Sequence, residues 1–232
     1  MGLWLELIVV VVGILLAFQV DRWYDDRMRQ AAVLDNLSGL AADFAANREA
    51  LLDAQQRHLR SLRAIEEFLL LDPNGAESLT HDDFYRFVSD AMEARSFSVA
   101  RRTYDSLIVA GLVEIIPSED LKAAIAGFYQ YVDRIEGAQE DNRNVFVSIF
   151  EPYVARNLDY AAAMVFRHPE AKQIRPLRAA EQFRDVIGSP DFEGALMMRW
   201  HVSRDLVNQY STALEQIDTI DRLTLELLDQ QE

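Results

Sequence analysis

Few side chains in this sequence are spaced for acid–base, nucleophilic or metal chemistry. The chain has four histidines and no cysteine, so it can form neither a disulfide nor a thiolate metal site. No two histidines stand at the spacing of a helical zinc pair, and the sequence contains no serine-nucleophile, phosphate-loop or dinucleotide motif. Scattered histidines are typical of solvated surface positions. We therefore predict that the protein is no enzyme and uses no cofactor or metal. The four histidines are His58, His81, His168 and His201.

One short run does combine potential metal ligands. His81, Asp82 and Asp83 follow directly on Thr80. Consecutive residues of a helix point in different directions, so these three side chains cannot close around one ion. A threonine followed by acidic residues is instead typical of a helix N-terminus, where the hydroxyl accepts a backbone N–H and the carboxylates face the helix dipole. We predict a helix that begins here and ends near residue 93.

A second polar cluster consists of Arg101, Arg102, Tyr104 and Asp105, in a predicted helix that Gly111 ends. The cluster is a candidate polar site. The alternative is ordinary helix patterning, in which Tyr104 packs into the core while the charged side chains face water. We favour the second interpretation.

Residues 3–20, LWLELIVVVVGILLAFQV, form the most apolar stretch of the chain. As a helix they would be about 27 Å long, close to the hydrocarbon thickness of a bilayer. Trp4 at one end and Trp23 with Tyr24 at the other stand where aromatic rings favour the headgroup layer. No basic residue precedes the stretch and no small-x-small cleavage site follows it, which argues against a signal peptide. We predict that residues 1–21 form a transmembrane anchor.

Glu6, Gly13 and Ala17 share one face of this predicted helix. Gly13 and Ala17 form a small-xxx-small pair, which lets two helix backbones approach closely in lipid. Glu6 lies about one turn inside the boundary, where a charge is costly unless it finds a partner or reaches the headgroups. One interpretation is that the anchor forms a homo-oligomer through this face. The other is that Glu6 reaches the headgroups and Gly13 is neutral, and both stay open.

The chain as a whole is strongly acidic. Asp and Glu number 38 against 23 Lys and Arg, which gives a formal net charge of −15. Such a field repels phosphate backbones, so we predict no nucleic-acid partner. Arg22, Arg27 and Arg29 follow the anchor and no basic residue precedes it. The positive-inside rule then places the domain in the cytoplasm.

Residues 22–232 carry the signals of an acidic, all-α domain. No proline interrupts residues 20–71, so the transmembrane helix is expected to continue into a long-helix bundle and to stop at the Asp-Pro-Asn-Gly turn, residues 72–75. Ser189 and Pro190 begin a last helix that needs no break before Gln230. Its apolar residues recur at spacings of four and three, as in the seam of a bundle helix. They are Leu206, Tyr210, Ala213, Ile217, Ile220 and Leu227.

The middle of the chain is less regular. Ser118 caps a helix that we expect to reach about residue 157, with a bend at Pro152, because proline has no N–H to donate. Residues 112–116 are the only β-like stretch. Residues 168–176 are expected to form a loop, followed by a helix of about ten residues from Leu177.

The N-terminus also resembles a known family. Residues 6–20, ELIVVVVGILLAFQV, and Trp23 are similar to the start of a bacterial family of uncharacterised, N-terminally anchored membrane proteins, a domain of unknown function. Residues 103–107, Gly111 and residues 121–129 also look like that family's pattern. The resemblance implies a single-pass protein of the bacterial inner membrane and no assigned activity. The family's basic N-terminal tail, which would place the domain outside the cytoplasm, is missing here. The side of the membrane therefore stays open.

Two functions are compatible with these features. The first is a structural or protein-interaction protein whose anchor self-associates and whose long helices bind an unknown protein partner. The second is a membrane-tethered sensor that binds a small ligand between bundle helices lined by Phe128, Tyr129, Tyr131 and Phe146. Because aromatic residues at this spacing are more typical of a core than of a pocket, we rank interaction first.

Overall fold

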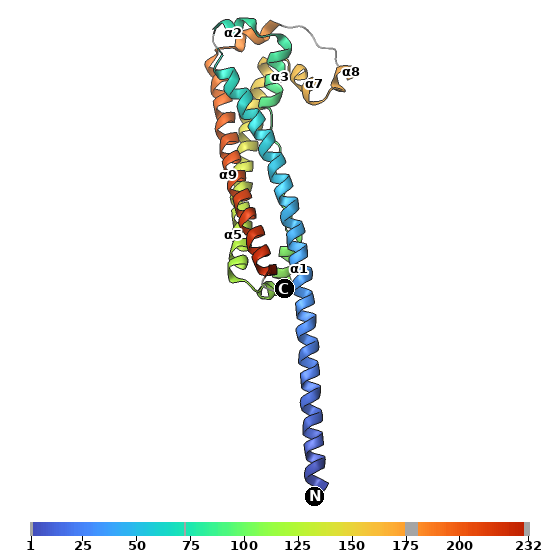
Figure 1. Ribbon diagram of the computed structural model, residues 1–232. Coiled ribbons are helices and arrows are strands. Elements are labelled where there is room, and N and C mark those ends of the chain that lie inside the picture. The colour runs from blue at the N-terminus through green and yellow to red at the C-terminus, as the bar shows by residue number, and fades with distance from the viewer. Residues whose placement is uncertain (1, 72, 175–180, 230–232) are drawn as a thin grey trace. The chain divides into compact units, whose positions relative to one another are not determined.

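The computed structural model describes the backbone of residues 2–71, 73–174 and 181–229. Within these ranges, the side chains of residues 2–12, 14–15, 25–26, 29–34, 73–74, 115, 172, 174 and 181–182 are not among those described. The described backbone is helical with short connections and contains no strand (Figure 1). The predicted all-α bundle is confirmed.

Three long helices carry most of the chain: α1 (Gly2–Leu69), α5 (Glu119–Val145) and α9 (Pro190–Asp229). Shorter helices connect them. They are α2 (Pro73–Ser78), α3 (His81–Ala91), α4 (Arg102–Ala110), α6 (Glu151–Asn157), α7 (Tyr160–Arg167) and α8 (Ala171–Ile174). Two 3₁₀ segments, Val113–Ile115 and Glu181–Val186, and one π segment, Phe146–Phe150, complete the described chain.

The helix ends follow the predicted capping residues. At the starts of α3, α5 and α9, a side-chain hydroxyl oxygen accepts a hydrogen bond from the backbone N–H of the residue three positions later. The accepting residues are Thr80 (3.1 Å), Ser118 (3.2 Å) and Ser189 (3.2 Å). Gly111 ends α4 with φ at 65°, a left-handed conformation that glycine adopts without a Cβ penalty. α1 ends at Leu69, just before the predicted turn.

Three predictions about the shorter segments need correction, because the expected loop 168–176 contains α8 and two further segments differ, and one helix, α7, was not predicted. The β-like stretch 112–116 forms the 3₁₀ segment Val113–Ile115, since the left-handed Gly111 turns the chain there and the described residues offer it no partner strand. An additional helix, α7, follows Asp159, whose carboxylate accepts the N–H groups of Ala161 and Ala162 at 3.1 and 3.3 Å. The helix expected from Leu177 lies partly outside the described residues, and its remainder is the 3₁₀ segment Glu181–Val186.

The predicted bend near Pro152 is a π segment. Over Phe146–Phe150 the helix widens, and the N–H of Glu151 donates to the carbonyl of Phe146, five residues back. Pro152 then stands in the first turn of α6, where its missing N–H costs little. One helical path therefore runs from α5 through the wider turn into α6, and the proline, which has no N–H to donate, stands just after that turn.

The chain divides into two units, each described here by itself. The first contains Met1–Ala46, Ala100–Ile125 and Ile220–Glu232. In it α4 lies against α1, where the N–H of Thr103 donates to the carboxylate of Asp43 (2.8 Å). A Cβ at Gly39 would come within 2.9 Å of the Thr103 Cγ2, so the glycine permits this close approach.

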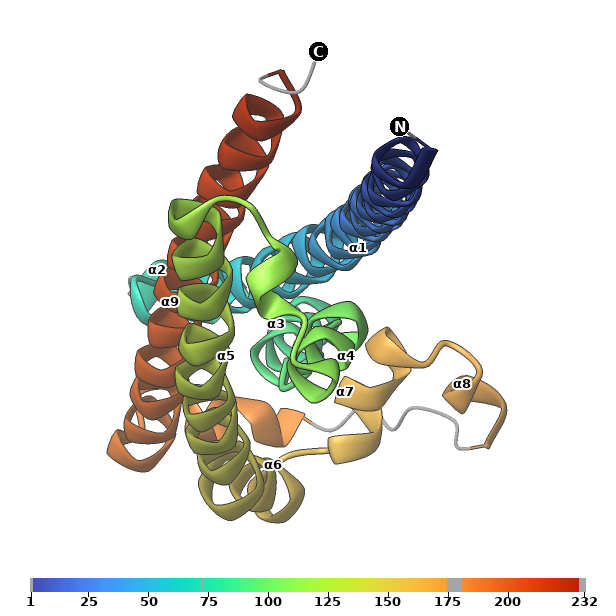
Figure 2. The same cartoon turned by 90° about the horizontal axis from the view of Figure 1, so that it is seen from below.

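The second unit contains Asn47–Val99 and Ala126–Thr219. Within it, parts of α1, α5 and α9 run side by side, while α3 and α7 pack together (Figure 2). The predicted seam of α9 is confirmed: Leu206, Tyr210, Ala213 and Ile217 are fully buried. Ile220, in the first unit, is also buried, whereas Leu227 is half-buried.

One end of this second unit has an aromatic core. The ring of Phe192 lies 5.5 Å from those of Phe68 and Tyr153 and 6.1 Å from that of Phe84. All of the Phe192 side chain is buried. Such pairs add to the free energy gained from apolar burial alone.

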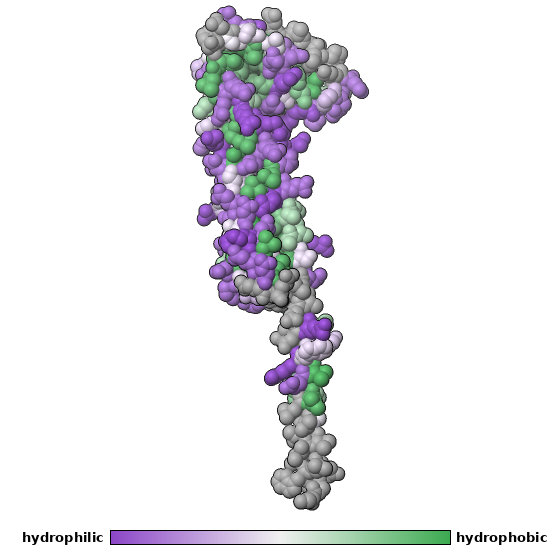
Figure 3. Space-filling model, viewed as in Figure 1, coloured by the Kyte–Doolittle hydropathy of each residue, from purple (hydrophilic) through white to green (hydrophobic). Residues whose placement is uncertain are grey.

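The predicted membrane anchor falls largely outside the described side chains, since residues 3–12, 14 and 15 are not among them. Across the side chains that are described, no helix has the length and apolar character needed to span a bilayer. Figure 3 shows polar residues over most of the visible face, with apolar atoms at the surface of the N-terminal part of α1.

The aromatic core supplies a stability test. Phe192→Ala would leave a cavity among three rings, so we expect the free energy of unfolding to fall by about 3–5 kcal/mol. Met198 lies on the same helix with 45% of its surface exposed, and Met198→Ala should cost less than about 1 kcal/mol. Urea unfolding of the full-length protein in a neutral detergent measures both. Equal losses for the two variants would contradict this assignment of the core.

Candidate functional site

The residues proposed for anchor association and for the aromatic belt are described only in part. Trp4 and Glu6 lie outside the described side chains. Gly13 and Ala17 are exposed, and a Cβ added at Gly13 would meet no atom within 4 Å. Trp23 is 60% exposed, with the Arg27 guanidinium 5.1 Å from its ring centroid. Tyr24 is equally open to solvent.

The polar cluster of α4 is a local surface arrangement. The Nε of Arg101 donates to both carboxylate oxygens of Asp105, at 2.9 and 3.1 Å, one helical turn away. Arg102 is exposed and Tyr104 half-buried, while Leu107 packs inside. Leu107 and Arg102 thus face different sides of an amphipathic helix, but Tyr104 is no more buried than Arg101 and Asp105, and the choice between the two interpretations stays a prediction.

The aromatic residues considered for a ligand pocket behave mainly as core. Phe128 and Tyr129 are buried and pack edge to face with centroids 5.2 Å apart. Tyr131 and Phe146 are half-buried. None of the four lines the cleft described below.

The expectation of four solvated histidines is wrong at one position. His168 and His201 are exposed and His81 is partly so, but His58 is completely buried. Its Nε2 lies 3.1 Å from the carbonyl oxygen of Arg95 and donates to it. Burial lowers the pKa of His58 to about 4, which outweighs the opposing effect of this hydrogen bond. His58 is therefore neutral near pH 7.

His58 belongs to a larger arrangement around residues 91–97, which we call the 91–97 segment. Beyond Ala91 this segment is not helical, yet parts of it are buried between helices. Buried backbone N–H and C=O groups must find partners, and here side chains provide them. Arg167 donates to the carbonyl of Met92 (2.6 Å), and the amide oxygen of Gln139 accepts the N–H of Phe97.

Arg199 contributes most to this arrangement. It lies on α9, is fully buried, and donates to the carbonyls of Ala91 (3.4 Å) and Glu93. Its Nη1 also donates to the side-chain oxygen of Asn142 on α5, at 2.5 Å. Burial lowers the pKa of Arg199 to about 10, so the guanidinium stays charged at neutral pH. One side chain thereby joins α9, α5 and the end of α3.

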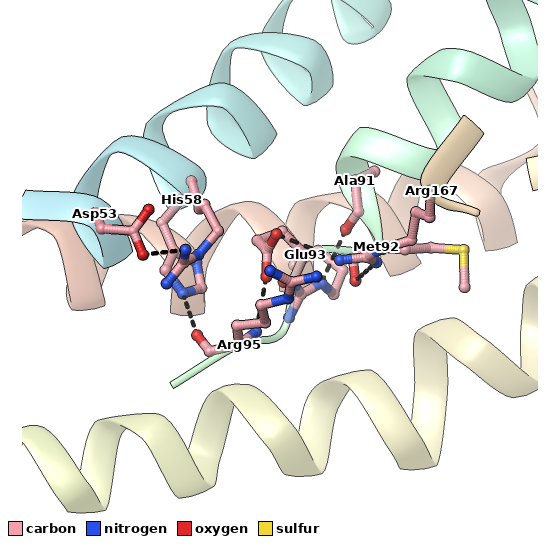
Figure 4. A network of polar contacts seen from close by, with 9 residues as sticks. Asp53, His58, Ala91, Met92, Glu93, Arg95 and Arg167 are labelled. Atoms are coloured by element: carbon pink, nitrogen blue, oxygen red, sulfur yellow. Dashed lines mark hydrogen bonds and ion pairs between the residues drawn. The ribbon is translucent and has the colours of Figure 1, made fainter. Parts of the chain in front are cut away.

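The side chains of the 91–97 segment border a polar cleft with a volume of about 200 Å³. Figure 4 shows the polar network that contains three of its lining residues, Glu93, Arg95 and Arg167, together with His58. The cleft is lined by Arg57, Arg60, Ser89, Asp90, Glu93, Arg95, Phe166 and Arg167. Burial in this cleft raises the pKa of Asp90, although Arg60 and Arg167 act in the opposite direction.

The first unit contains a hollow of another kind. It has a volume of about 310 Å³ and an almost wholly apolar lining from α1, α5 and α9. Leu37, Leu40 and Phe44 line it on the α1 side. It holds no cluster of titratable groups, so the polar cleft is the stronger candidate for chemistry.

Neither Arg199 nor His58 was predicted as part of a site, although a signal exists for both. The α9 seam, continued towards the N-terminus at spacings of three and four, passes through Ser203 and Arg199. His58 holds a similar position, seven residues after Leu51 and four before Leu62. A charged or titratable residue at a seam position indicates a buried polar partner.

Removing the Arg199 guanidinium should destabilise the second unit. Arg199→Met keeps a long aliphatic side chain but removes the donor for the oxygens of Ala91, Glu93 and Asn142. We therefore expect the free energy of unfolding to fall by about 3 kcal/mol. Arg204→Met, on the exposed side of the same helix, should change it by no more than about 0.5 kcal/mol. Urea titration of both variants checks this; an Arg199→Met protein as stable as wild type would contradict it.

His58 should make stability depend on pH. Its pKa is lower in the folded than in the unfolded protein, so its contribution is complete above about pH 6.5 and is lost as the pH falls towards 4. Between pH 7.5 and pH 5 this loss is about 2 kcal/mol. We expect His58→Gln, which keeps a donor for the Arg95 carbonyl, to remove that part of the pH dependence. His201→Gln is the exposed control, and parallel stability–pH curves for all three proteins would refute the assignment.

Comparisons with known proteins do not bear on these assignments, which rest on the geometry of the chain itself. No family model, curated protein or solved structure matches it. The N-terminal resemblance described above therefore stays a prediction. The features that carry the functional argument are the exposed apolar residues of α1, the buried Arg199 arrangement and the polar cleft.

Proposed function

We propose that this protein is a membrane-anchored, self-associating helical protein that acts by binding other proteins. One observation carries the proposal: large apolar side chains are exposed along the N-terminal part of α1. Each of the described members of this run is more than half exposed. They are Leu16, Phe18, Val20, Trp23, Tyr24 and Met28.

The sequence that contains the first of these residues favours lipid as their surroundings. At 100° per residue, five of the six exposed residues lie within an arc of about 140°, and only Phe18 points away from it, so by themselves they form one apolar stripe. Residues 7–18, however, contain no charged or hydrogen-bonding side chain on any side of the helix. A helix that is apolar all round suits a bilayer.

The aromatic and basic residues that follow support a membrane–water interface at the end of this apolar stretch. Trp23 and Tyr24 expose their rings, and Arg27 lies over the Trp23 ring at 5.1 Å. Amphipathic aromatic rings and basic side chains are enriched where the hydrocarbon layer meets the headgroups. We place the protein in the bacterial inner membrane, in line with the family resemblance.

Self-association through the anchor is the second part of the proposal. Gly13 and Ala17 are exposed, so another helix could approach the backbone there. In lipid, small residues four apart favour such close approach, since backbone packing replaces the absent hydrophobic driving force. The occupant of this face is a second copy of α1.

An alternative is a membrane-tethered sensor. The polar cleft of the second unit favours it, because ligand sites combine a hollow with converging polar groups. The aromatic residues first considered for that role are not the lining of this cleft.

The anchor proposal can be tested in membranes. We expect the full-length protein to sediment with membranes after alkaline extraction and to form dimers on chemical crosslinking. Gly13→Ile should still sediment but reduce the crosslinked dimer about tenfold, because the added side chain separates the backbones. Phe18→Ile is a matched control, since Phe18 lies about 140° around the helix from Gly13.

The two parts of the proposal fail separately. Protein found in the supernatant with its first twenty residues intact would overturn the anchor. Undiminished dimer in Gly13→Ile would overturn association through this face. Protease access in spheroplasts, which cleaves only domains outside the cytoplasm, assigns the side of the membrane.

A further inference from the structure

The polar cleft of the second unit has a charge opposite to that of the whole chain. The protein carries a formal net charge of −15, yet four arginines and two carboxylates line this cleft. The arginines come from three places that are distant in the sequence: α1, the 91–97 segment and α7. The fold therefore gathers an excess of positive charge in one hollow.

Two of the four arginines are already engaged. Arg167 donates to the Met92 carbonyl and lies 3.3 Å from the carboxylate of Glu93. Arg57 pairs with Asp53, one helical turn away, although its Nε is buried without a hydrogen-bond partner among the described residues. These two side chains shape the cleft.

The other two, Arg60 and Arg95, are available. Among the described residues, neither guanidinium takes part in a hydrogen bond or a close ion pair. Asp90 also lines the cleft, but it forms no close ion pair with either, and burial raises the pKa of its carboxyl group. Both arginines are exposed, so an anion in solution can reach these two guanidinium groups.

The backbone that carries Arg95 is fixed from several sides. Arg199 holds the carbonyl of Glu93, and His58 holds the carbonyl of Arg95 itself at 3.1 Å. The carboxylate of Glu93 accepts the N–H of Arg95 at 2.8 Å. This region is therefore preorganised, so a ligand that binds Arg95 does not first have to order the chain.

We propose that this cleft binds a small oxyanion, a phosphate or carboxylate group, held by Arg60 and Arg95. The guanidinium group is planar and presents paired N–H donors that match either group in a bidentate manner. Phe166 adds an apolar surface on which the remainder of the ligand can rest. The inference rests on the second unit alone and is independent of the membrane proposal.

The test uses full-length protein in a neutral detergent. Inorganic phosphate, malonate and chloride are added at equal ionic strength, and binding is followed by the melting temperature and by calorimetry. We expect phosphate or malonate, but not chloride, to raise the melting temperature, because a ligand that binds only the folded state stabilises it. If only phosphate or only malonate raises the melting temperature, the cleft prefers a phosphate or a carboxylate group, respectively. A rise with both supports the shared oxyanion chemistry.

Variants connect the signal to the cleft. Arg60→Gln/Arg95→Gln should weaken binding by about tenfold or more, the loss expected when charge-assisted hydrogen bonds are removed. Arg63→Gln, an exposed change on the same helix, should leave binding unchanged. Without ligand, the double variant should melt near the wild-type temperature, because both side chains are exposed and the change breaks no hydrogen bond in the described structure. If the double variant does not fold, Arg60→Gln and Arg95→Gln are measured separately, and each should also weaken binding.

A further arm separates a free oxyanion from a lipid headgroup. The same detergent is mixed with phosphatidic acid, and the melting temperature is measured again. A rise with this lipid but not with free phosphate or malonate, lost in the double variant, assigns the phosphate to a lipid. No rise with any of the three probes, or a rise that survives Arg60→Gln/Arg95→Gln, overturns the proposal.

Discussion

A stretch of non-helical backbone buried between helices is the constraint on which the second unit depends. Past Ala91 the chain leaves α3, and its N–H and C=O groups can no longer pair with one another as they do in a helix. Side chains from α1, α5, α7 and α9 take over that pairing, with Arg199 making the largest contribution. Because these bonds join four helices to the same few residues, the 91–97 segment fixes which faces of those helices meet.

Arginine suits this task for a reason of chemistry. It offers five N–H donors in a rigid plane and remains charged when buried, so one side chain can serve several carbonyl oxygens from different elements. Arg199 uses its donors in this way inside the protein, and Arg167 donates to the Met92 carbonyl and the Glu93 carboxylate near the surface. Arg60 and Arg95 stand beside them with the same donors and no such backbone partners among the described residues. The contrast separates arginines that build the fold from arginines that face a hollow.

The sequence predicts the long helices well because their signals are local. Each of these signals acts within a few residues of the chain. They are the uninterrupted apolar spacing, the caps Thr80, Ser118 and Ser189, and Gly111 at the end of α4. The cleft depends instead on contacts between distant parts of the chain: His58 meets a carbonyl 37 residues away and Arg199 one that is 106 away. Composition and spacing describe the side chain but not the backbone group opposite it. For the same reason, His58 was predicted to be a surface residue although it is buried.

The π segment Phe146–Phe150 places one more residue in its turn than an α-helix would. Buried positions on α5, such as Ile135, Gln139 and Asn142, follow spacings of four and three, but the next buried residues are Phe150 and Val154, one position later than that rhythm requires. Deleting one residue from this turn would restore the regular pitch and bring Phe150 and Val154 back into that rhythm, so both would still face the core. The wide turn thus absorbs one extra residue without turning the helix that follows. A change of one residue in chain length is tolerated better here than in the regular turns of α5, where it would rotate every later side chain by about 100°.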